Sequence, residues 1–195
     1  MSITELSPGL LISAPNMADS NFAQSVVLMA EHDEEGAIGF VLNKPTPIRL
    51  GILLEGVDED LAEAAHLSGL SDRPVFIGGP VQRHVAWVLY IRDKDEDLDE
   101  GSIEVGDTLV IGASIDTLRA FVTGQRTGPF HVLLGYAGWG EQQLEDEISQ
   151  GSWLPLELGA DLAFDVPPEE RWEEAVRRLG VTPGAFLMGV PGAKA

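Results

Sequence analysis

The sequence offers one lysine in a position to do ligand chemistry. The segment Asn43-Lys44-Pro45 follows an apolar, β-branched run, so a strand end would hold the ammonium group in place. Only three lysines occur, at positions 44, 94 and 194, against 32 acidic residues, which makes a positioned cation conspicuous. Asn43 and Lys44 could bind an anionic ligand, because glycines such as Gly78 and Gly79 let a backbone approach a ligand closely.

The same residues also have a structural interpretation, and it is the favoured one. Asn43 and Pro45 are typical of a strand end, and Gly78-Gly79-Pro80 is typical of a tight turn. Pro80 has no N–H to donate, which weakens the case for an anion site at that turn.

His32 is a second candidate, because it lies beside Glu31 at a predicted strand end, where general acid–base groups often lie. Adjacent residues on a strand point to opposite faces, so the pair would cooperate only if the hairpin bends there. A structural role for His32 is therefore favoured, with catalysis as the alternative. No histidine has close metal-ligand spacing to another.

Aromatic residues form the third candidate group. Tyr136, Trp139 and Trp153 are predicted to cluster around a glycine-punctuated turn at 135–140 that leads into an acidic helix. Such side chains suit either the edge of a core or a ligand groove, and the core edge is favoured. The glycines would let the chain turn sharply beside large rings.

The acidic run from Asp93 to Glu104 has the carboxylate spacing of a Ca²⁺ loop, with acids at positions 93, 95, 97, 99 and 104. Leu98 stands where such a loop needs glycine, and a strand rather than a helix is predicted before it. A solvated hairpin tip is favoured over a weak cation site. We predict no cofactor and no resident metal.

Composition narrows the possible functions further. The chain lacks P-loop, dinucleotide, nucleophile-elbow and zinc-protease motifs, and it has no cysteine. A net charge of −20 repels phosphate backbones, so direct nucleic-acid binding is not expected. No run approaches the roughly 18 apolar residues of a membrane span, and no signal peptide is evident, so a cytoplasmic location is expected. A high content of acidic residues with few lysines also fits adaptation to a saline environment, and this interpretation stays open.

Hydrophobic periodicity predicts the elements that must position these residues. Strands are expected over 9–14, 25–30, 37–42, 75–77, 85–91, 108–111 and 130–136. Helices are expected over 50–65 (two short ones, broken near Gly56), 114–122, 141–148 and 168–179. Helix 168–179 should carry the pairs Glu173–Arg177 and Glu174–Arg178. Strands and helices mix without βαβ alternation, which favours an α+β fold with a largely antiparallel sheet. We expect one domain, 1–195, with a frayed tail from about residue 189.

Five segments in this order resemble the AlgH/YqgE family of small bacterial proteins, over most of the chain from about Leu6 to Gly180. They are 9–15, 31–36, 39–45, 78–81 and 135–139. The resemblance implies a bent sheet closing towards a pseudo-barrel with helices packed outside, and a bacterial cytoplasmic protein. Some members are named as transcriptional regulators, and no catalytic residues carry over. Members often have Pro-Gly where this chain has Glu141-Gln142, so the helix start is expected to differ slightly.

Two functions remain open. The favoured one is a non-enzymatic regulatory or interaction protein that acts through a protein or small-molecule partner. The alternative is an enzyme or sensor that binds an anionic metabolite, such as a nucleotide, near Lys44. The candidate ligand-binding residues are His32, Asn43, Lys44, Gly78, Gly79 and Trp139. An interaction protein predicts an exposed apolar patch, whereas the alternative predicts a pocket with positive potential inside an acidic shell.

Overall fold

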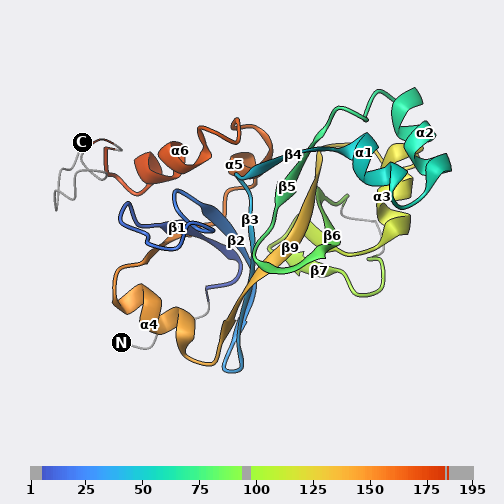
Figure 1. Cartoon of the computed structure of the whole chain (residues 1–195). Helices are drawn as coiled ribbons and strands as arrows, with labels where there is room; N and C mark the ends of the chain where they lie inside the picture. Colours follow the sequence, from blue (N-terminus) through green and yellow to red (C-terminus); the bar gives the residue numbers. More distant parts are fainter. Residues whose placement is uncertain (1–5, 94–97, 183, 185–195) are drawn as a thin grey trace.

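The computed structural model describes residues 6–93, 98–182 and 184. Within them the chain forms ten strands and six helices (Figure 1). The strands are β1 (Gly9–Ser13), β2 (Val26–Asp33), β3 (Gly36–Val41), β4 (Pro45–Arg49), β5 (Pro74–Ile77), β6 (Val81–Ile91), β7 (Ile103–Val105), β8 (Leu109–Gly112), β9 (Phe130–Gly140) and β10 (Trp153–Glu157). The helices are α1 (Leu50–Glu55), α2 (Glu59–Leu67), α3 (Ile115–Val122), α4 (Gln143–Ser149), α5 (Ala160–Phe164) and α6 (Arg171–Arg178). The predicted frayed tail from residue 189 lies outside the described residues.

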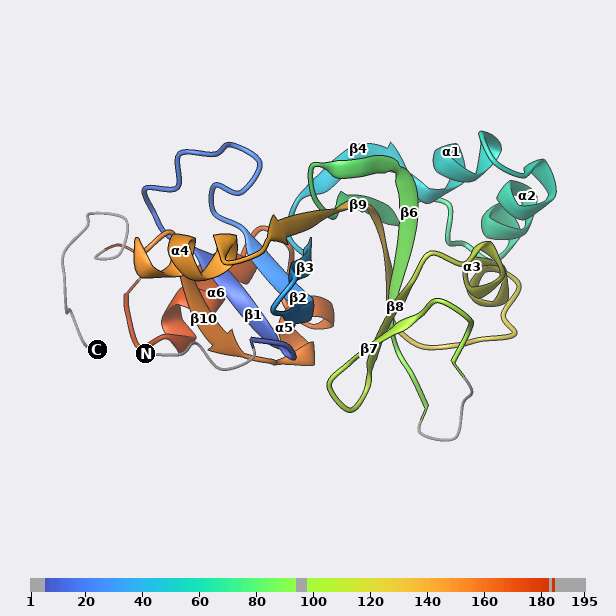
Figure 2. The same cartoon turned by 90° about the horizontal axis from the view of Figure 1, so that it is seen from below.

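The strands pair along one path, β10-β1-β2-β3-β9-β6-β8-β7, and all of these pairs are antiparallel. Off this path, β5 pairs in parallel with β9, and β4 pairs antiparallel with β5. The sheet is bent (Figure 2). It stays open, because the path ends at β10 on one side and at β7 on the other. The predicted α+β fold with a largely antiparallel sheet is confirmed.

Strand β9 joins the two ends of the molecule. Its first half pairs with β6 and β5, and its second half pairs with β3. The prediction of a strand that stops at Tyr136 is wrong, because β9 continues through Gly140 and the turn is confined to 141–142. Gly135 has a φ of 70°, and a Cβ there would lie 2.4 Å from the Val81 carbonyl oxygen. The glycines thus allow a strand to bend against another strand, rather than ending it.

The core consists of three clusters, and alternate side chains of one strand enter different clusters. Leu10 and Ile12 of β1 share a cluster with Trp172 of α6, whereas Leu11 shares one with Leu144 of α4. Figure 1 accordingly places α6 and α4 on opposite sides of β1 and β2. The third cluster packs α1, α2 and α3 against β5, β6, β8 and β9 at the other end (Figure 2).

Most of the predicted helices are confirmed. The break near Gly56 separates α1 from α2, and Ser114 caps α3 by accepting a hydrogen bond from the Thr117 N–H. Helix α6 begins at Arg171, three residues later than predicted, because 168–170 form a turn. No helix within the described residues is long and apolar enough to cross a membrane.

Four elements have no counterpart in the prediction: β4, β7, β10 and α5. Pro45 and Pro47 suggested the end of a strand, yet both lie in β4, which pairs with β5 alone. An edge strand tolerates proline because one side of its backbone has no partner strand. Pro155 lies in β10, which is also at an edge of the sheet.

Candidate functional site

Asn43 and Lys44 both hold the chain segment that precedes β2. The Lys44 ammonium donates to the Ala23 carbonyl at 2.7 Å. The Asn43 side chain accepts from the Val26 N–H and donates to the Gln24 carbonyl, each at 2.9 Å. Burial lowers the pKa of Lys44, and Asp19 opposes that shift. Within the chain, these contacts engage one donor of the Lys44 ammonium group and both the carbonyl and the amino group of the Asn43 side chain.

A pocket of about 240 Å³ does lie beside Lys44 and Asn43. Its other charged lining residues are Glu169 and Glu173, and Trp172 forms part of its wall. An anion entering this pocket would meet the carboxylate of Glu169, and that of Glu173, which is paired with Arg177, beside the single ammonium group. The electrostatics therefore do not favour the anionic metabolite that the sequence suggested as an alternative.

Gly78 and Gly79 do not line that pocket but lie against β9. A Cβ at Gly78 would lie 2.3 Å from the Gly135 carbonyl oxygen, and one at Gly79 would lie 2.1 Å from the Tyr136 carbonyl carbon. The Gly78 N–H donates to the Leu134 carbonyl at 2.8 Å, so it is not available to an anion. Close backbone packing accounts for both glycines.

His32 links the β2–β3 hairpin to α4. Its Nδ1 accepts a hydrogen bond from the Leu6 N–H at 3.0 Å, so the ring proton is on Nε2, which donates to Glu145 at 3.0 Å. The His32 side chain is only 5% exposed, whereas Glu31 is exposed. The two neighbours thus point in different directions, and the partner of His32 is Glu145.

Trp139 lies in a cluster of three aromatic rings next to α4. Its ring centroid is 5.8 Å from that of Trp153, and Phe22 contacts both. Glu147 accepts hydrogen bonds from both indoles, at 3.1 Å from Trp139 and 2.8 Å from Trp153. Both indole N–H groups of the cluster therefore have a hydrogen-bond acceptor within the chain, as expected for the edge of a core.

Tyr136 does not belong to this cluster, contrary to the prediction. It packs against Phe40 and Trp87, with ring centroids 6.5 and 6.2 Å away. Side chains alternate along a strand, and Trp139 follows Tyr136 by three positions, an odd number. The two rings therefore leave β9 on opposite faces.

The predicted cation loop lies partly outside the described residues, which omit 94–97. Of its remaining carboxylates, Asp99 accepts a hydrogen bond from Thr117 and lies 3.5 Å from Arg126, and Glu104 pairs with Arg92. Among all the described residues, including those of this loop, no group of three or more histidine, aspartate or glutamate side chains is arranged to hold a metal.

A buried arginine and histidine lie between α6 and the sheet. Arg171 is 2% exposed and donates to the backbone carbonyls of Leu42 and Val166, the latter at 2.9 Å. Burial lowers the pKa of Arg171 to about 10. His131 Nε2 lies 2.6 Å from the Ala163 carbonyl, to which it must donate, so Arg171 beside it contributes positive charge rather than a second hydrogen bond. Burial, assisted by that charge, lowers the pKa of His131 to about 4.

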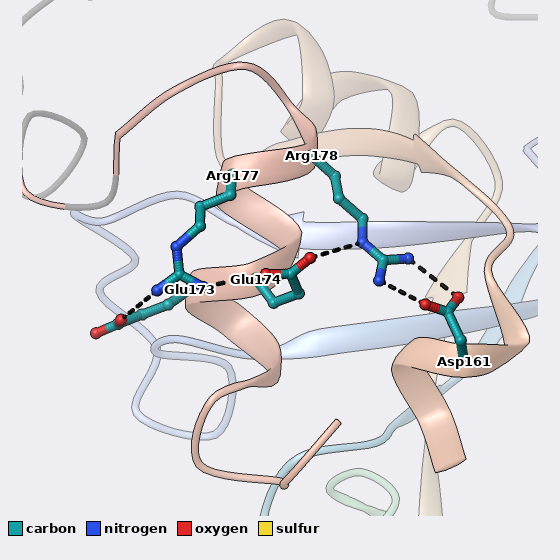
Figure 3. A network of polar contacts seen from close by, with 5 residues as sticks. All are labelled: Asp161, Glu173, Glu174, Arg177 and Arg178. Atoms are coloured by element: carbon teal, nitrogen blue, oxygen red, sulfur yellow. Dashed lines mark hydrogen bonds and ion pairs between the residues drawn. The ribbon is translucent and has the colours of Figure 1, made fainter. Parts of the chain in front are cut away.

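The exposed face of α6 carries a network of ion pairs (Figure 3). Arg177 contacts Glu173, four residues before it, and Glu174, three residues before it. Arg178 contacts Glu174 at 3.2 Å and Asp161 of α5 at 2.5 Å. The predicted pairs are confirmed, and the bond to Asp161 adds a link between α5 and α6.

The face formed by α1 and α2 exposes large apolar side chains, which the sequence did not suggest. Ile52 of α1 is 61% exposed, Val57 between the helices is 63% exposed, and Leu67 at the end of α2 is 79% exposed. Ile48, just before α1, is 39% exposed. We call these four side chains the α1–α2 patch.

The patch could have been recognised from helical phase. Leu50 and Leu54 form the buried stripe of α1, and Ile52 is two residues from each, about 200° around the helix. Leu61 and Ala65 form the buried stripe of α2, and Leu67 is out of phase with Leu61. Large apolar side chains outside the buried stripe of a helix have no core to enter.

A groove of about 660 Å³ runs between the two helices beside the patch. Ile52 and Ala62 provide apolar lining, and His66 lies at the end of the same face of α2. Four carboxylates and one arginine also line it: Glu55, Glu59, Glu63, Asp72 and Arg49. None of these carboxylates forms an ion pair with any residue that the structure describes.

Comparison with known sequences places the chain in a family. The model of the family described as AlgH-like matches residues 10–184. The chain belongs to the AlgH-like family. It is 51% identical over 191 residues to a UPF0301 protein of Anaeromyxobacter sp. (strain Fw109-5), covering 97% of this chain and 96% of that relative. It is 38% identical to a UPF0301 protein of Vibrio parahaemolyticus, covering 89% and 91%.

Solved structures support the same assignment of this AlgH-like chain. The solution structure of the AlgH protein from Pseudomonas aeruginosa matches with a TM-score of 0.76 and 34% identity, over 100% of this chain and 98% of that one. The crystal structure of protein DIP2367 from Corynebacterium diphtheriae matches with a TM-score of 0.68, over 95% and 92%. Its identity of 19% makes it a likeness of fold alone.

Proposed function

We propose that this AlgH-like protein is a non-enzymatic interaction protein that binds a protein partner through the α1–α2 patch. We further propose that it acts in the bacterial cytoplasm as one domain spanning residues 1–195. The observation that carries the proposal is the concentration of apolar surface. Of the seven large apolar side chains exposed among the described residues, four fall between positions 48 and 67. The four come from β4, α1, α2 and the α1–α2 connection, which pack next to one another, and exposed apolar surface of this kind is typical of protein–protein contact sites.

The competing function, an anionic-metabolite enzyme or sensor at Lys44, has less support. Lys44 donates to the Ala23 carbonyl, and the adjacent pocket is lined by Glu169 and Glu173. Regulation by direct operator binding is also disfavoured, because a net charge of −20 repels the phosphate backbone. A regulatory role would therefore operate through another protein.

Site-specific photo-crosslinking in the native host tests the proposal. A photoreactive amino acid at position 67 should crosslink to one or a few discrete proteins, because Leu67 is 79% exposed within the patch. The matched control is the same amino acid at position 91, where Ile91 is exposed on β6. Equal crosslinking patterns from the two positions would contradict the proposal. A melting-temperature rise with a nucleotide, abolished by Lys44→Ala, would instead favour the metabolite site.

A further inference from the structure

We infer that the groove between α1 and α2 binds a basic, amphipathic helix of a partner protein. This inference rests on the proposed function and specifies the chemistry of the partner. It follows from two independent properties of the groove, its apolar lining and its uncompensated negative charge.

The apolar property comes from side chains on both helices. Ile52 of α1 and Ala62 of α2 line the groove; Ile48 and Leu67 do not line it but are exposed beside it in sequence, next to the lining residues Arg49 and His66. Helix α2 has nine residues, which corresponds to a length of about 13 Å. A groove of this length accepts two or three turns of a docked helix, whose apolar anchors recur at i, i+3 or i+4, and i+7.

The negative charge of the groove determines the sign of the partner's charge. Among the lining residues, the four carboxylates (Glu55, Glu59, Glu63 and Asp72) are opposed by the guanidinium group of Arg49. By contrast, the carboxylates Glu173 and Glu174 on α6 are already paired with Arg177 and Arg178. Lysine or arginine side chains flanking an apolar stripe would therefore gain complementary contacts at the α1–α2 groove that α6 does not offer.

A second copy of this chain is the less suitable occupant. Each copy carries a net charge of −20, and a symmetric contact at this face would bring the same four carboxylates of both copies together. Like charges in contact disfavour association. A basic partner avoids that repulsion, and its positive charges attract the carboxylates of the groove.

Three labelled synthetic helices test the inference by fluorescence anisotropy with the full chain. The first has leucines at i, i+3, i+4 and i+7 with lysines on its flanks; the second has the same composition in scrambled order; the third has glutamate in place of lysine. We expect the first to bind at least about tenfold more tightly than either of the others, and salt to weaken it. Equal affinity for the first two peptides would overturn the inference, because it would mean that charge alone drives binding.

Matched variants locate the binding. Glu59→Gln combined with Glu63→Gln, and separately Ile52→Ser, should each weaken the first peptide about tenfold. The controls are Glu31→Gln combined with Glu35→Gln, which removes the same charge from another acidic pocket, and Ile91→Ser on β6. All these side chains are exposed, so melting temperatures should verify that each variant folds. Equal weakening by groove and control variants would overturn the inference.

The outcomes also separate this inference from the proposed function. If position 67 crosslinks to discrete proteins but the basic helix binds no better than the other peptides, the inferred partner class is overturned, whereas the proposed interaction function stands. Failure of both experiments would reject both ideas. A dimer in light scattering that dissociates on Ile52→Ser would identify the occupant as a second copy, and so overturn the inference.

Discussion

Individual cationic side chains in this acidic chain are used to hold backbone. Lys44 donates to the Ala23 carbonyl, and Arg171 donates to the carbonyls of Leu42 and Val166. The contacts of Lys44 with Ala23 and of Arg171 with Leu42 each fix one segment against another that is distant in sequence. At the scale of the residue, then, a rare cation indicates a structural clamp here rather than a ligand contact.

His131 should make stability depend on pH. Its pKa in the folded chain is about 4, below the ordinary value of about 6.5, so the unfolded chain takes up the proton first as the pH falls. The folded state therefore loses stability between about pH 6.5 and pH 4, by up to about 3 kcal/mol. Urea denaturation over this pH range should show a steeper loss for the natural chain than for His131→Gln. Parallel pH profiles would contradict this prediction.

Gly79 should be required for packing. In Gly79→Ala the new Cβ would lie 2.1 Å from backbone atoms of Tyr136, which cannot move away as a flexible side chain could. We expect a loss of about 2–3 kcal/mol in the free energy of unfolding, or failure to fold. The control is Gly56→Ala, whose Cβ would be 3.5 Å from the nearest atom and whose φ is −79°. That variant should be neutral or stabilised by about 0.5 kcal/mol in chemical denaturation. Equal stability of the two variants would refute the packing argument.

At the scale of the element, two arginines of α6 allow a direct comparison of buried and exposed contacts. Arg171→Met should cost about 3 kcal/mol or more, because it leaves the buried Leu42 carbonyl and the partly buried Val166 carbonyl without their charged donor. Arg178→Met should cost less than about 1 kcal/mol, although it removes ion pairs to Asp161 and Glu174, because exposed pairs contribute little. Both losses are measured by urea denaturation. A larger loss for Arg178→Met would show that the α5–α6 link matters more than the buried clamp.

The elements that could be predicted from the sequence are those whose pattern is local. Helix α6 has a continuous apolar stripe with opposite charges at its ends, and α3 has a capping serine. Strands β4 and β10 were missed because proline argues against a strand, and only the sheet order shows that both are edges. The length of β9 was missed because the reason for its glycines is the backbone of a distant strand.

The candidate site was harder to predict than the fold. Asn43, Lys44, Gly78 and Gly79 were chosen by residue type, yet their roles depend on partners 17 or more residues away in sequence. The α1–α2 patch is visible in the phase of Ile52 and Leu67, but only once the buried stripes of both helices are known. Candidate residues were chosen by residue type. Their position relative to the core, however, decides which side chains are exposed and can contact a partner.

At the scale of the whole molecule, net charge and local ion pairs act in opposite directions. A charge of −20 destabilises the compact chain through self-repulsion, whereas pairs such as Asp161–Arg178 stabilise it. Salt screens both, and the repulsion is summed over far more carboxylates than the pairs involve. The repulsion should therefore dominate the response to salt.

The melting temperature should accordingly rise as NaCl increases from about 0.01 M to about 0.15 M, over which the screening length falls from about 30 Å to about 8 Å. Each kcal/mol of relief corresponds to about 2–4 °C for a chain of this size. Differential scanning calorimetry measures the shift, and a variant with several exposed carboxylates neutralised, including Glu31→Gln and Glu35→Gln, should show a smaller one. A melting temperature that stays flat or falls would mean that ion pairs outweigh self-repulsion, and it would remove adaptation to salt as an explanation of the acidity.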